Sequence, residues 1–537
     1  MPDYKPADRV HHAETGFDID PVYGPRPRGT WTAEDSLGAP GTFPFTRHIR
    51  VEGFRTRPWA PSLYAGFGTP EDANRRFRQL LAEGNGRANC AFDLPTQIGL
   101  DSDDLDAVGE VGRVGVAIDS LADFEVMFAG IPLDTVPVSL NVNATAPIIL
   151  AMLVATAHRQ GVDLADVSGT IANDILHEYI GRGTWRYPPA PSLRLAVDVL
   201  RFVNETMPRF FAFNIRGILL HESGASPAQE VGITFAIACR YIDEALSRGL
   251  AVDDFAPKMS FFFGTGLHLF EEAAKFRAAR RLWARLLRDT YKATRAESQM
   301  MRFTSVAACG SHFTSVTPEL NLVRGTLGCL AAALGGAQAM LGTTIDEAFD
   351  IPTEATQHLA LRTQQIVALE SDVCSTVDPL GGSYFVEAMT DAIEAAARVE
   401  FAGVGGSAGI VDAIEAGVPQ AALAERAFSL ASEIASGIRP VVGVNVYVDG
   451  DSRTRELQIH HADPSVEASR ITAVSILRAE RDAATVERAL DAVRVAASGT
   501  ESVMPSIIAA VEAYATVGEI SSALEDVLGT YREPTAL

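Results

Sequence analysis

The feature that most constrains the fold is a regular alternation of short β-type runs with amphipathic helical patterns. Six β-type runs are evident, at residues 89–94, 136–143, 169–173, 211–215, 259–263 and 303–308. The segments between them, such as SLRLAVDVLRFV and AQEVGITFAIACRYIDEAL, carry apolar residues at three- and four-residue spacing, as helices do. Strand–helix repetition of this kind predicts parallel strands joined by crossover helices.

Six such units, with room for two more between residues 63 and 383, fit an eight-stranded (β/α)8 TIM barrel better than an open sheet. A doubly wound α/β sheet is the alternative, although no GxGxxG follows any of the runs. We therefore predict an α/β fold in three parts. These are an extended N-terminal arm rich in Pro, Arg and Gly (residues 1–60), a barrel domain (61–390) and a helical C-terminal region (391–537).

Composition excludes several classes of protein. The net charge of −23 disfavours nucleic-acid binding, which needs a basic surface. The five cysteines include no CxxC pair, and the eleven histidines include no HExxH, so neither a disulfide framework nor a metal site is supported. The N-terminus lacks an apolar signal region, and no apolar stretch is long enough to cross a membrane. We expect a cytoplasmic protein without a membrane or nucleic-acid partner.

Polar residues follow several of the runs, and the carboxyl ends of barrel strands are where chemistry is expected. They are Asp93, Asn141, Asn143, Asn173, Asp174, Arg216 and Ser260. Helix capping is the alternative role for the Asn and Asp residues, and a structural ion pair is the alternative for Arg216. Arginine presents a planar fork that suits a carboxylate or a phosphate.

Motifs along most of the chain resemble one family. They are FPFTR (43–47), RPWAPSLYAGFGT (57–69), AFDLPTQIGLDSD (91–103), GEVGRVGVAIDSL (109–121), GTIANDILHEYIGRGT (169–184), EEAAKFRAARRLWAR (271–285), LRTQQIVALES (361–371), DPLGGSYFVE (378–387) and RAERD (478–482). Their identity and order resemble the large subunit of adenosylcobalamin-dependent acyl-CoA mutases. The resemblance implies a barrel that splits around its axis and threads coenzyme A through the middle.

The same resemblance implies radical chemistry. An adenosyl radical formed from the cofactor abstracts a substrate hydrogen, and a group then migrates to the neighbouring carbon, while the protein positions the substrate and excludes water. Methylmalonyl-CoA, isobutyryl-CoA, ethylmalonyl-CoA and 2-hydroxyisobutyryl-CoA types share this scaffold. Because the chain has no DxHxxG motif, we expect no cobalamin-binding domain in it. A separate cobalamin-binding small subunit would then bring the cofactor, in a homodimer or an α2β2 assembly.

Site residues are transferred by matching positions. Tyr64 and Arg182 match the contacts to a free substrate carboxylate, which favours a carboxylated acyl-CoA, and Ala91 matches the form without the acidic residue of hydroxyacyl types. Arg57, Lys258 and Ser260 match the positions that hold the CoA phosphates, and Glu347 matches the acid that binds the adenosyl ribose. Outside these matches, Arg216 is a candidate for the substrate and His221, two positions beyond the family's His, for catalysis, as acid–base or carboxylate-binding groups of a cobalamin-independent enzyme. Gln338 and Asn143 are further candidates for the cofactor. A buried Arg182 without an anion would be costly, which supports the carboxylate.

Several polar positions of the family are apolar or small here. The family's GYH reads Gly217-Ile218-Leu219, the Gln of GTIQND is Ala172, HxQT reads Thr304-Ser305-Val306-Ala307, and QSLHTN reads Gln338-Ala339-Met340-Leu341-Gly342-Thr343. Upstream of Tyr64, the expected TMY and RQ read Glu52-Gly53-Phe54 and Ser62-Leu63. These losses leave two alternatives to the mutase: a cobalamin-independent acyl-CoA enzyme, such as a decarboxylase or epimerase, that uses no cofactor, and a non-catalytic structural subunit.

Overall fold

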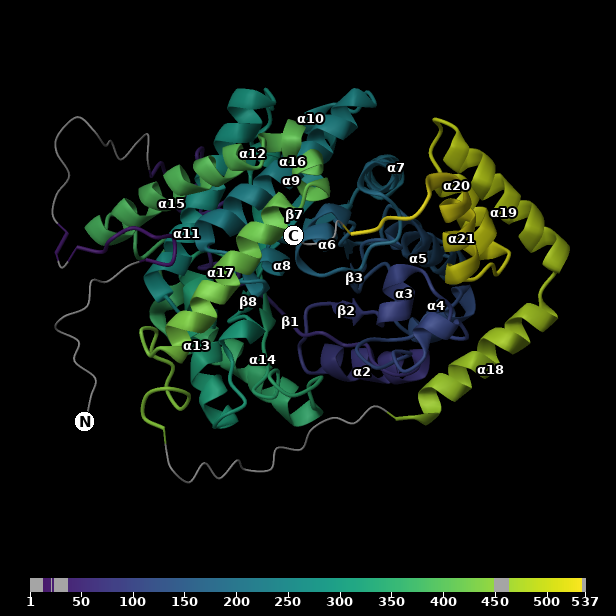
Figure 1. Cartoon of the computed structure of the whole chain (residues 1–537), viewed down its shortest axis with the longest axis horizontal. Helices are drawn as coiled ribbons and strands as arrows, with labels where there is room; N and C mark the ends of the chain where they lie inside the picture. Colours follow the sequence, from purple (N-terminus) through teal and green to yellow (C-terminus); the bar gives the residue numbers. More distant parts are fainter. Residues whose placement is uncertain (1–12, 21, 24–36, 449–462, 534–537) are drawn as a thin grey trace.

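The computed structural model describes residues 13–20, 22–23, 37–448 and 463–533 (Figure 1). Each of the six β-type runs forms a strand. The strands are β1 (Ala60–Ser62), β2 (Ala88–Ala91), β3 (Val138–Asn141), β4 (Gly169–Ile171), β5 (Phe210–Phe211), β6 (Phe213–Ile215), β7 (Met259–Phe263), β8 (Arg302–Ala307) and β9 (Ala339–Gly342). Since β5 and β6 are two halves of one interrupted strand, β1 and β9 bring the barrel to eight.

All pairings between these strands are parallel, in the orders β1-β9-β8-β7-β6 and β2-β3-β4-β5. Two seams join these halves. At one, Ala65 just after β1 bridges Cys90 of β2, with the N–H of Ala65 donating to Asn89 O at 2.9 Å. At the other, the N–H of Asn214 donates to Ala172 O at 3.0 Å. The strands therefore close into the predicted barrel in two halves held by few hydrogen bonds, which fits a barrel that can part around its axis.

Helices surround the strands, as Figure 1 shows. They are α2 (Pro70–Ala82), α3 (Leu94–Ile98), α4 (Leu121–Met127), α5 (Ala146–Gln160), α6 (Ile175–Gly181), α7 (Pro189–Thr206), α8 (Gly217–Glu222), α9 (Pro227–Ser247), α10 (Val252–Phe255), α11 (Leu269–Arg285), α12 (Ala296–Gln299), α13 (Asn321–Leu334) and α14 (Glu354–Leu369). The main core lies between this layer and the strands. There the ring of Phe261 on β7 packs 4.8 Å from that of Trp283 on α11.

The chain after the barrel is helical, in line with the expected C-terminal region. Its helices are α15 (Tyr384–Gly403), α16 (Gly406–Glu415), α17 (Val418–Ala435), α18 (Ser465–Glu480), α19 (Ala483–Ser498), α20 (Met504–Glu512) and α21 (Val517–Leu528). Figure 1 places α15 against α11, and α18–α21 on the opposite side of the barrel. Buried Arg277 on α11 pairs with Asp378 and Glu387, which ties the start of this region to the barrel.

The N-terminal arm runs along α11. Arg280 donates to Phe45 O at 2.9 Å and to Thr46 O at 2.7 Å, and the N–H of Glu14 donates to Glu271 at 3.0 Å. Residues 1–12, 21 and 24–36 of the predicted arm lie outside the described residues. The boundaries at 60 and 390 remain predictions.

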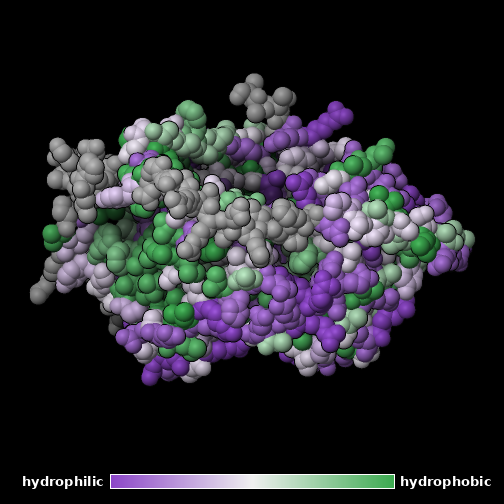
Figure 2. All heavy atoms as spheres, turned by 90° about the horizontal axis from the view of Figure 1, so that it is seen from below, coloured by the Kyte–Doolittle hydropathy of each residue, from purple (hydrophilic) through white to green (hydrophobic). Residues whose placement is uncertain are grey.

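The surface is uneven in polarity. Seen from below, hydrophobic residues gather toward the half of the molecule that carries α11–α15, and hydrophilic residues dominate elsewhere on that face (Figure 2). On α13 and α14 the exposed apolar side chains include Val323, Leu327 and Ile366. No helix in the described part of the chain combines the length and the apolarity that a membrane span requires.

Candidate functional site

The inner face of the barrel is polar at mid-height. Cys90, Leu140 and Phe261 point outward into the main core, so the neighbouring positions along each strand point inward. These inward residues are Ser62, Asn89, Ser139, Thr170, Asn214, Ser260 and Thr304. Bulky branched apolar side chains normally fill a TIM barrel. Small hydroxyl and amide groups stand in their place, so the inside of the barrel has a polar lining.

Hydrogen bonds within this lining leave some groups unused. Asn89 Nδ2 donates to Ser62 Oγ at 3.1 Å, and Asn214 Nδ2 donates to Ser260 Oγ at 3.1 Å. Ser260 Oγ in turn donates to Phe213 O at 2.8 Å. The buried hydroxyl of Thr170 has no partner among the described residues. A buried hydroxyl without a partner is costly, and a polar ligand inside the barrel would supply one.

Basic residues stand at the amino ends of the strands. Arg87 and Lys258 each lie two residues before an inward position, and Arg302 pairs in register with Ser260. Burial lowers the pKa of Arg87, Lys258 and Arg302. The buried Nε of Arg87 has no hydrogen-bond partner among the described residues. These partly dehydrated cations lie at one end of the polar lining, and guanidinium groups suit phosphate. Arg302 Nη1 already donates to Glu297 O at 2.9 Å.

The predicted phosphate contacts lie at this end, with differences. Arg57 is exposed in the segment before β1, and its charge together with burial lowers the pKa of Arg50. Lys258 Nζ donates to the carbonyls of Val203 and Asn204 at 3.4 and 3.2 Å, so the ammonium caps α7. Sequence reasoning missed Arg87 and Arg302, because their place at the channel is evident only once the strand register is known.

Gln338, predicted to bind the cofactor, also lies at the amino end. Its Oε1 accepts from the N–H of Phe303 at 2.8 Å, and its Nε2 donates to Gly336 O at 2.6 Å. It immediately precedes β9, whereas Glu347 follows that strand. The structure therefore does not bring Gln338 together with the other predicted cofactor residues; its contacts join β8 to β9.

The carboxyl mouth of the barrel is apolar. Ile218, Phe262, Val306, Cys309 and Leu341 form a buried cluster, against which half-buried Tyr64 and Leu219 pack. We call these seven residues the mouth cluster. It contains four of the positions at which the family's polar residues are replaced, namely 218, 219, 306 and 341. The replacements therefore act together, giving the mouth a low polarity that strengthens electrostatic interactions at its edge.

Arg182 lies at the edge of this mouth. Its Nη1 donates to Gln97 Oε1 at 2.6 Å and lies 3.6 Å from Glu178 Oε1, and 35% of the side chain is exposed. The argument that a buried Arg182 requires a substrate anion is therefore wrong, because the group is partly hydrated and already faces a carboxylate. Its proposed contact with substrate stays a prediction.

Arg216 differs from Arg182. It follows β6 and is 6% exposed, its Nη2 donates to Asn141 Oδ1, and its guanidinium carbon lies 5.5 Å from the centre of the Phe262 ring. Among the described residues no carboxylate forms an ion pair with it, and its buried Nε has no hydrogen-bond partner. Sequence position alone predicted a substrate contact for it, and the structure places it beside the mouth cluster.

His221 lies behind the mouth in a buried charged chain. Its Nδ1 lies 3.2 Å from Glu230 Oε2, and its Nε2 lies 3.1 Å from His312 Nε2. Burial opposes protonation, but Cys309 and Glu230 raise the pKa of His221 well above its usual value. A Cβ at Gly264 would lie 2.4 Å from His221 Cγ, so glycine there makes room for the ring. The chemistry available to His221 is that of a fixed hydrogen-bond donor.

Lys275 completes this chain. Its Nζ donates to Glu230 Oε2 and to Gly264 O, both at 2.8 Å, and lies 2.6 Å from Glu272 Oε2. Lys275 and Glu230 are both 0% exposed. Sequence reasoning missed Lys275 and Glu230 because both lie within ordinary amphipathic helix patterns.

Two carboxylates approach each other at the outer side of the mouth. A Cβ at Gly310 would lie 3.1 Å from Glu347 Cγ and 3.8 Å from Glu222 Oε1. The N–H groups of Gly310 and Ser311 donate to Glu222 at 2.9 and 3.0 Å. The side chain of Glu347 is exposed at this edge, and partial dehydration by its neighbours, followed by the charge of Glu222, raises its pKa. The carboxyl group of Glu347 can therefore hold a proton more readily than an ordinary glutamate, so it can donate a hydrogen bond to a ligand hydroxyl as well as accept one.

Asn143 is part of a buried polar network. Its Nδ2 donates to Glu178 Oε1, and its Oδ1 accepts from the N–H of Asp174 at 2.9 Å. Both side-chain ends are therefore engaged within the protein. Its predicted contact with the cofactor stays untested.

Asp93 is a cap rather than an open acid. It is 0% exposed and accepts from the N–H groups of Thr96 and Gly112 at 3.0 and 2.8 Å, beginning α3. Burial raises its pKa to about 7. The folded state therefore retains a proton that the unfolded state has released.

We expect Asp93 to make the protein less stable as pH rises from about 4 to 7. The free energy of unfolding should fall by about 1.4 kcal/mol per pH unit from this group alone. Urea unfolding at several pH values, compared between wild type and Asp93→Asn, measures this. A difference between the two proteins that does not vary with pH would contradict the assignment.

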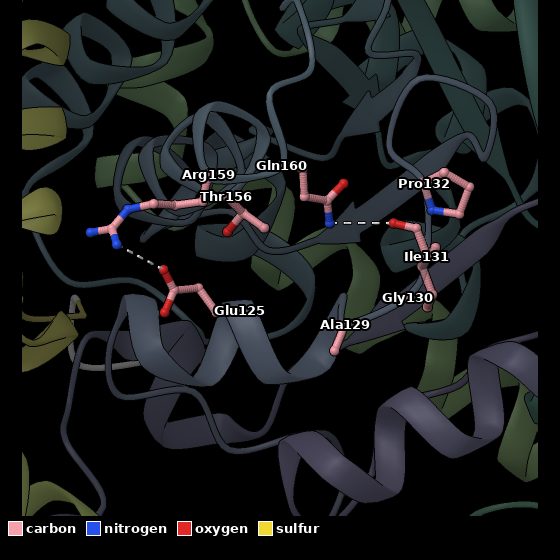
Figure 3. Close-up of a pocket in the computed structure, with 8 residues that line it drawn as sticks. All are labelled: Glu125, Ala129, Gly130, Ile131, Pro132, Thr156, Arg159 and Gln160. Carbon is pink, nitrogen blue, oxygen red and sulfur yellow. Dashed lines mark hydrogen bonds and ion pairs between the residues drawn. The ribbon is translucent and has the colours of Figure 1, made fainter.

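A hollow of about 650 Å³ lies elsewhere, between α4 and α5 near the amino ends of the strands (Figure 3). Its polar groups are already paired: Arg159 lies 3.7 Å from Glu125, and Gln160 Nε2 donates to Ile131 O at 3.3 Å. We do not assign chemistry to this hollow. Across the described residues, no three His, Cys, Asp or Glu side chains are grouped to hold a metal ion.

The sequence of the chain is similar to that of known acyl-CoA mutases. A family model described as methylmalonyl-CoA mutase matches residues 12–530. The chain is 41% identical over 512 residues to the 2-hydroxyisobutanoyl-CoA mutase large subunit of Aquincola tertiaricarbonis, covering 94% of this chain and 91% of that protein. It is 39% identical over 527 residues to methylmalonyl-CoA mutase of Escherichia coli, covering 98% and 73%. It is also 38% identical over 541 residues to the probable methylmalonyl-CoA mutase large subunit of Mycobacterium tuberculosis, covering 98% and 72%.

Proposed function

The chain belongs to the methylmalonyl-CoA mutase family, and we propose that it is the acyl-CoA-binding large subunit of a carbon-skeleton mutase. One observation carries this proposal: the charge and polarity of the residues inside the barrel change along its axis. Cations lie at the amino end, small polar groups line the middle, and the mouth cluster closes the carboxyl end. An acyl-CoA has the same sequence of groups, from phosphates through the pantetheine arm to the acyl thioester.

The roles of the chain's own residues follow from this arrangement. Arg87 and Arg302 bind phosphate, together with the predicted Arg57, Lys258 and Ser260. Asn89 and Thr170 form hydrogen bonds with the amides of the pantetheine arm. The mouth cluster excludes water from the thioester. Tyr64 and the arginines at the mouth favour a carboxylated acyl group.

The cofactor expected for this family is adenosylcobalamin, and the mouth offers residues that suit its adenosyl group. Glu347 presents its carboxylate in the recess beside Gly310, where ribose hydroxyls could donate to it. When bound, the cofactor supplies the radical that removes a substrate hydrogen. We propose that a separate cobalamin-binding small subunit brings it to the carboxyl mouth, in a cytoplasmic hetero-oligomer.

A turnover assay tests this function. The purified chain is incubated with methylmalonyl-, succinyl- and branched acyl-CoAs, with and without adenosylcobalamin and a cobalamin-binding small subunit, and products are followed by mass spectrometry. We expect an isomerised acyl-CoA only when cofactor and small subunit are both present. Turnover without cobalamin would contradict the radical mechanism, and failure to bind any CoA compound would contradict the assignment as a whole. The relatives found support neither the cobalamin-independent nor the non-catalytic alternative.

A further inference from the structure

Helix α18 is fastened to the barrel domain mainly by two arginines. Figure 1 places this helix at the rim of the molecule, beside α4. Three of its side chains are buried, namely those of Val466, Arg470 and Val474, so little apolar surface packs beneath it. Arg470 Nη2 donates to Asp119 at 2.9 Å and to Asp123 at 2.5 Å. Arg478 Nη2 donates to Asp101 at 2.7 Å. Ion pairs therefore hold α18 more than an apolar face does.

The acids beneath α18 belong to one segment, namely the connection between α3 and α4 (residues 99–120) and the first turn of α4. Burial, followed by the charge of Asp119, raises the pKa of Asp101 to about 7. Burial also raises the pKa of Asp123, although Arg470 opposes the rise, and Asp119 adds to it. Without the cations of α18, these buried carboxylates would repel one another and gain by moving into water. The closed position of the connection thus depends on α18.

The same connection holds α3, which reaches the edge of the carboxyl mouth. Asp119 accepts from the N–H and the hydroxyl of Ser102, at 2.6 and 2.8 Å, shortly after the end of α3. Gln97 on α3 accepts from Arg182 at the mouth edge at 2.6 Å. A displacement of Asp119 would therefore be passed along the chain to α3 and to the contact that closes this edge.

The two ends of α18 are held differently. At its C-terminal end, Arg481 donates to Glu519 at 2.7 Å and to Tyr514 O at 2.8 Å. At the other end, the exposed N–H of Gly109 donates to Glu467 at 3.0 Å. Release of Arg470 would leave α18 attached chiefly through its C-terminal end, about which it can swing.

We propose that α18 is a strap that keeps the connection between α3 and α4 closed, and that release of Arg470 from Asp119 and Asp123 opens the carboxyl mouth at Gln97. The strap is a conformational device of the chain itself, so it stands whether or not the barrel holds an acyl-CoA. With the strap closed, Cys309 of the mouth cluster is 0% exposed. The reactivity of this thiol therefore reports the opening of the mouth.

Thiol labelling of the full chain without ligand tests the proposal. Arg470→Met should raise the rate at which N-ethylmaleimide labels Cys309 by about 10-fold or more, measured on peptides by mass spectrometry. Cys239 on α9 and Cys329 on α13 are also buried, and they report unfolding of the rest of the chain. Their labelling rates should stay those of wild type, because the strap acts on the mouth alone.

Three further variants complete the test. Arg478→Met removes the less buried cation, whose side chain is 33% exposed, and should also speed labelling of Cys309. Arg470→Lys keeps the charge and should label within about threefold of wild type. Arg488→Met, at an exposed site on α19, should label as wild type does.

Unchanged labelling of Cys309 in both Arg470→Met and Arg478→Met would overturn the proposal. An equal rise at all three cysteines would do the same, since it would mean that α18 supports the whole fold rather than the mouth. Labelling of Cys309 in Arg470→Lys as fast as in Arg470→Met would show that the charge does not hold the strap, which also contradicts the proposal. None of these results bears on whether the chain binds CoA, so the proposed function is tested separately.

Discussion

Replacing Lys275 with methionine should destabilise the fold by about 3–5 kcal/mol, because it leaves a buried acid without its cation. Lys275 is the cation that faces both Glu230 and Glu272, at 2.8 and 2.6 Å, and all three side chains are buried. Lys275, followed by His221, lowers the pKa of Glu230 against the effect of burial. Without Lys275, Glu230 would keep only His221 and the N–H of Gly264 as partners.

Unfolding in urea, followed by circular dichroism, measures this loss. Lys292→Met makes the same chemical change at an exposed site and should alter stability by less than about 0.5 kcal/mol. A loss below about 1 kcal/mol for Lys275→Met would show that the buried chain does not hold the base of the mouth together.

The second large effect concerns coenzyme A. Arg87→Gln and Arg302→Gln should each weaken CoA binding by roughly 10- to 150-fold, the range expected for a hydrogen bond to a charged group. Arg87 immediately precedes β2 and Arg302 begins β8, so the two residues belong to different parts of the barrel and the double variant should approach the product of the single effects. We expect each substitution to weaken CoA binding because Arg87 and Arg302 are both partly dehydrated cations at the amino end of the polar lining.

Calorimetric titration with CoA tests this, and Arg494→Gln is a matched control on α19, where the arginine is half-buried and pairs with Asp491 and Asp526. Both the control and wild type should bind CoA alike. Binding by the double variant within about threefold of wild type would place the phosphates elsewhere.

The fold could be predicted from sequence wherever strands carry β-type residues. Runs such as MSFFF stand out because alternate residues face the core and are aromatic. The sequences APS and AMLG of β1 and β9 are short and have no β-branched residue. The sequence therefore predicts these two strands only indirectly, from the length of chain left for two more units. At residues 89–94 the strand ends early, because Asp93 caps α3.

The site was harder to predict, because its residues act through register and pairing. Arg302 is evident as a channel residue only through its pairing with Ser260. Gln338 matched a motif, yet the register places it before β9 rather than after it. The motif that contains Arg182 also does not show that Glu178 lies 3.6 Å from the guanidinium of Arg182.

A structure of the chain with bound CoA tests the central claim most directly, namely that one axial channel holds the substrate. We predict the phosphates beside Arg87 and Arg302, the pantetheine arm between Asn89 and Ser260, and the sulfur at Phe262 and Tyr64. CoA bound outside the barrel, for example in the hollow between α4 and α5, with the polar lining empty, would contradict the account.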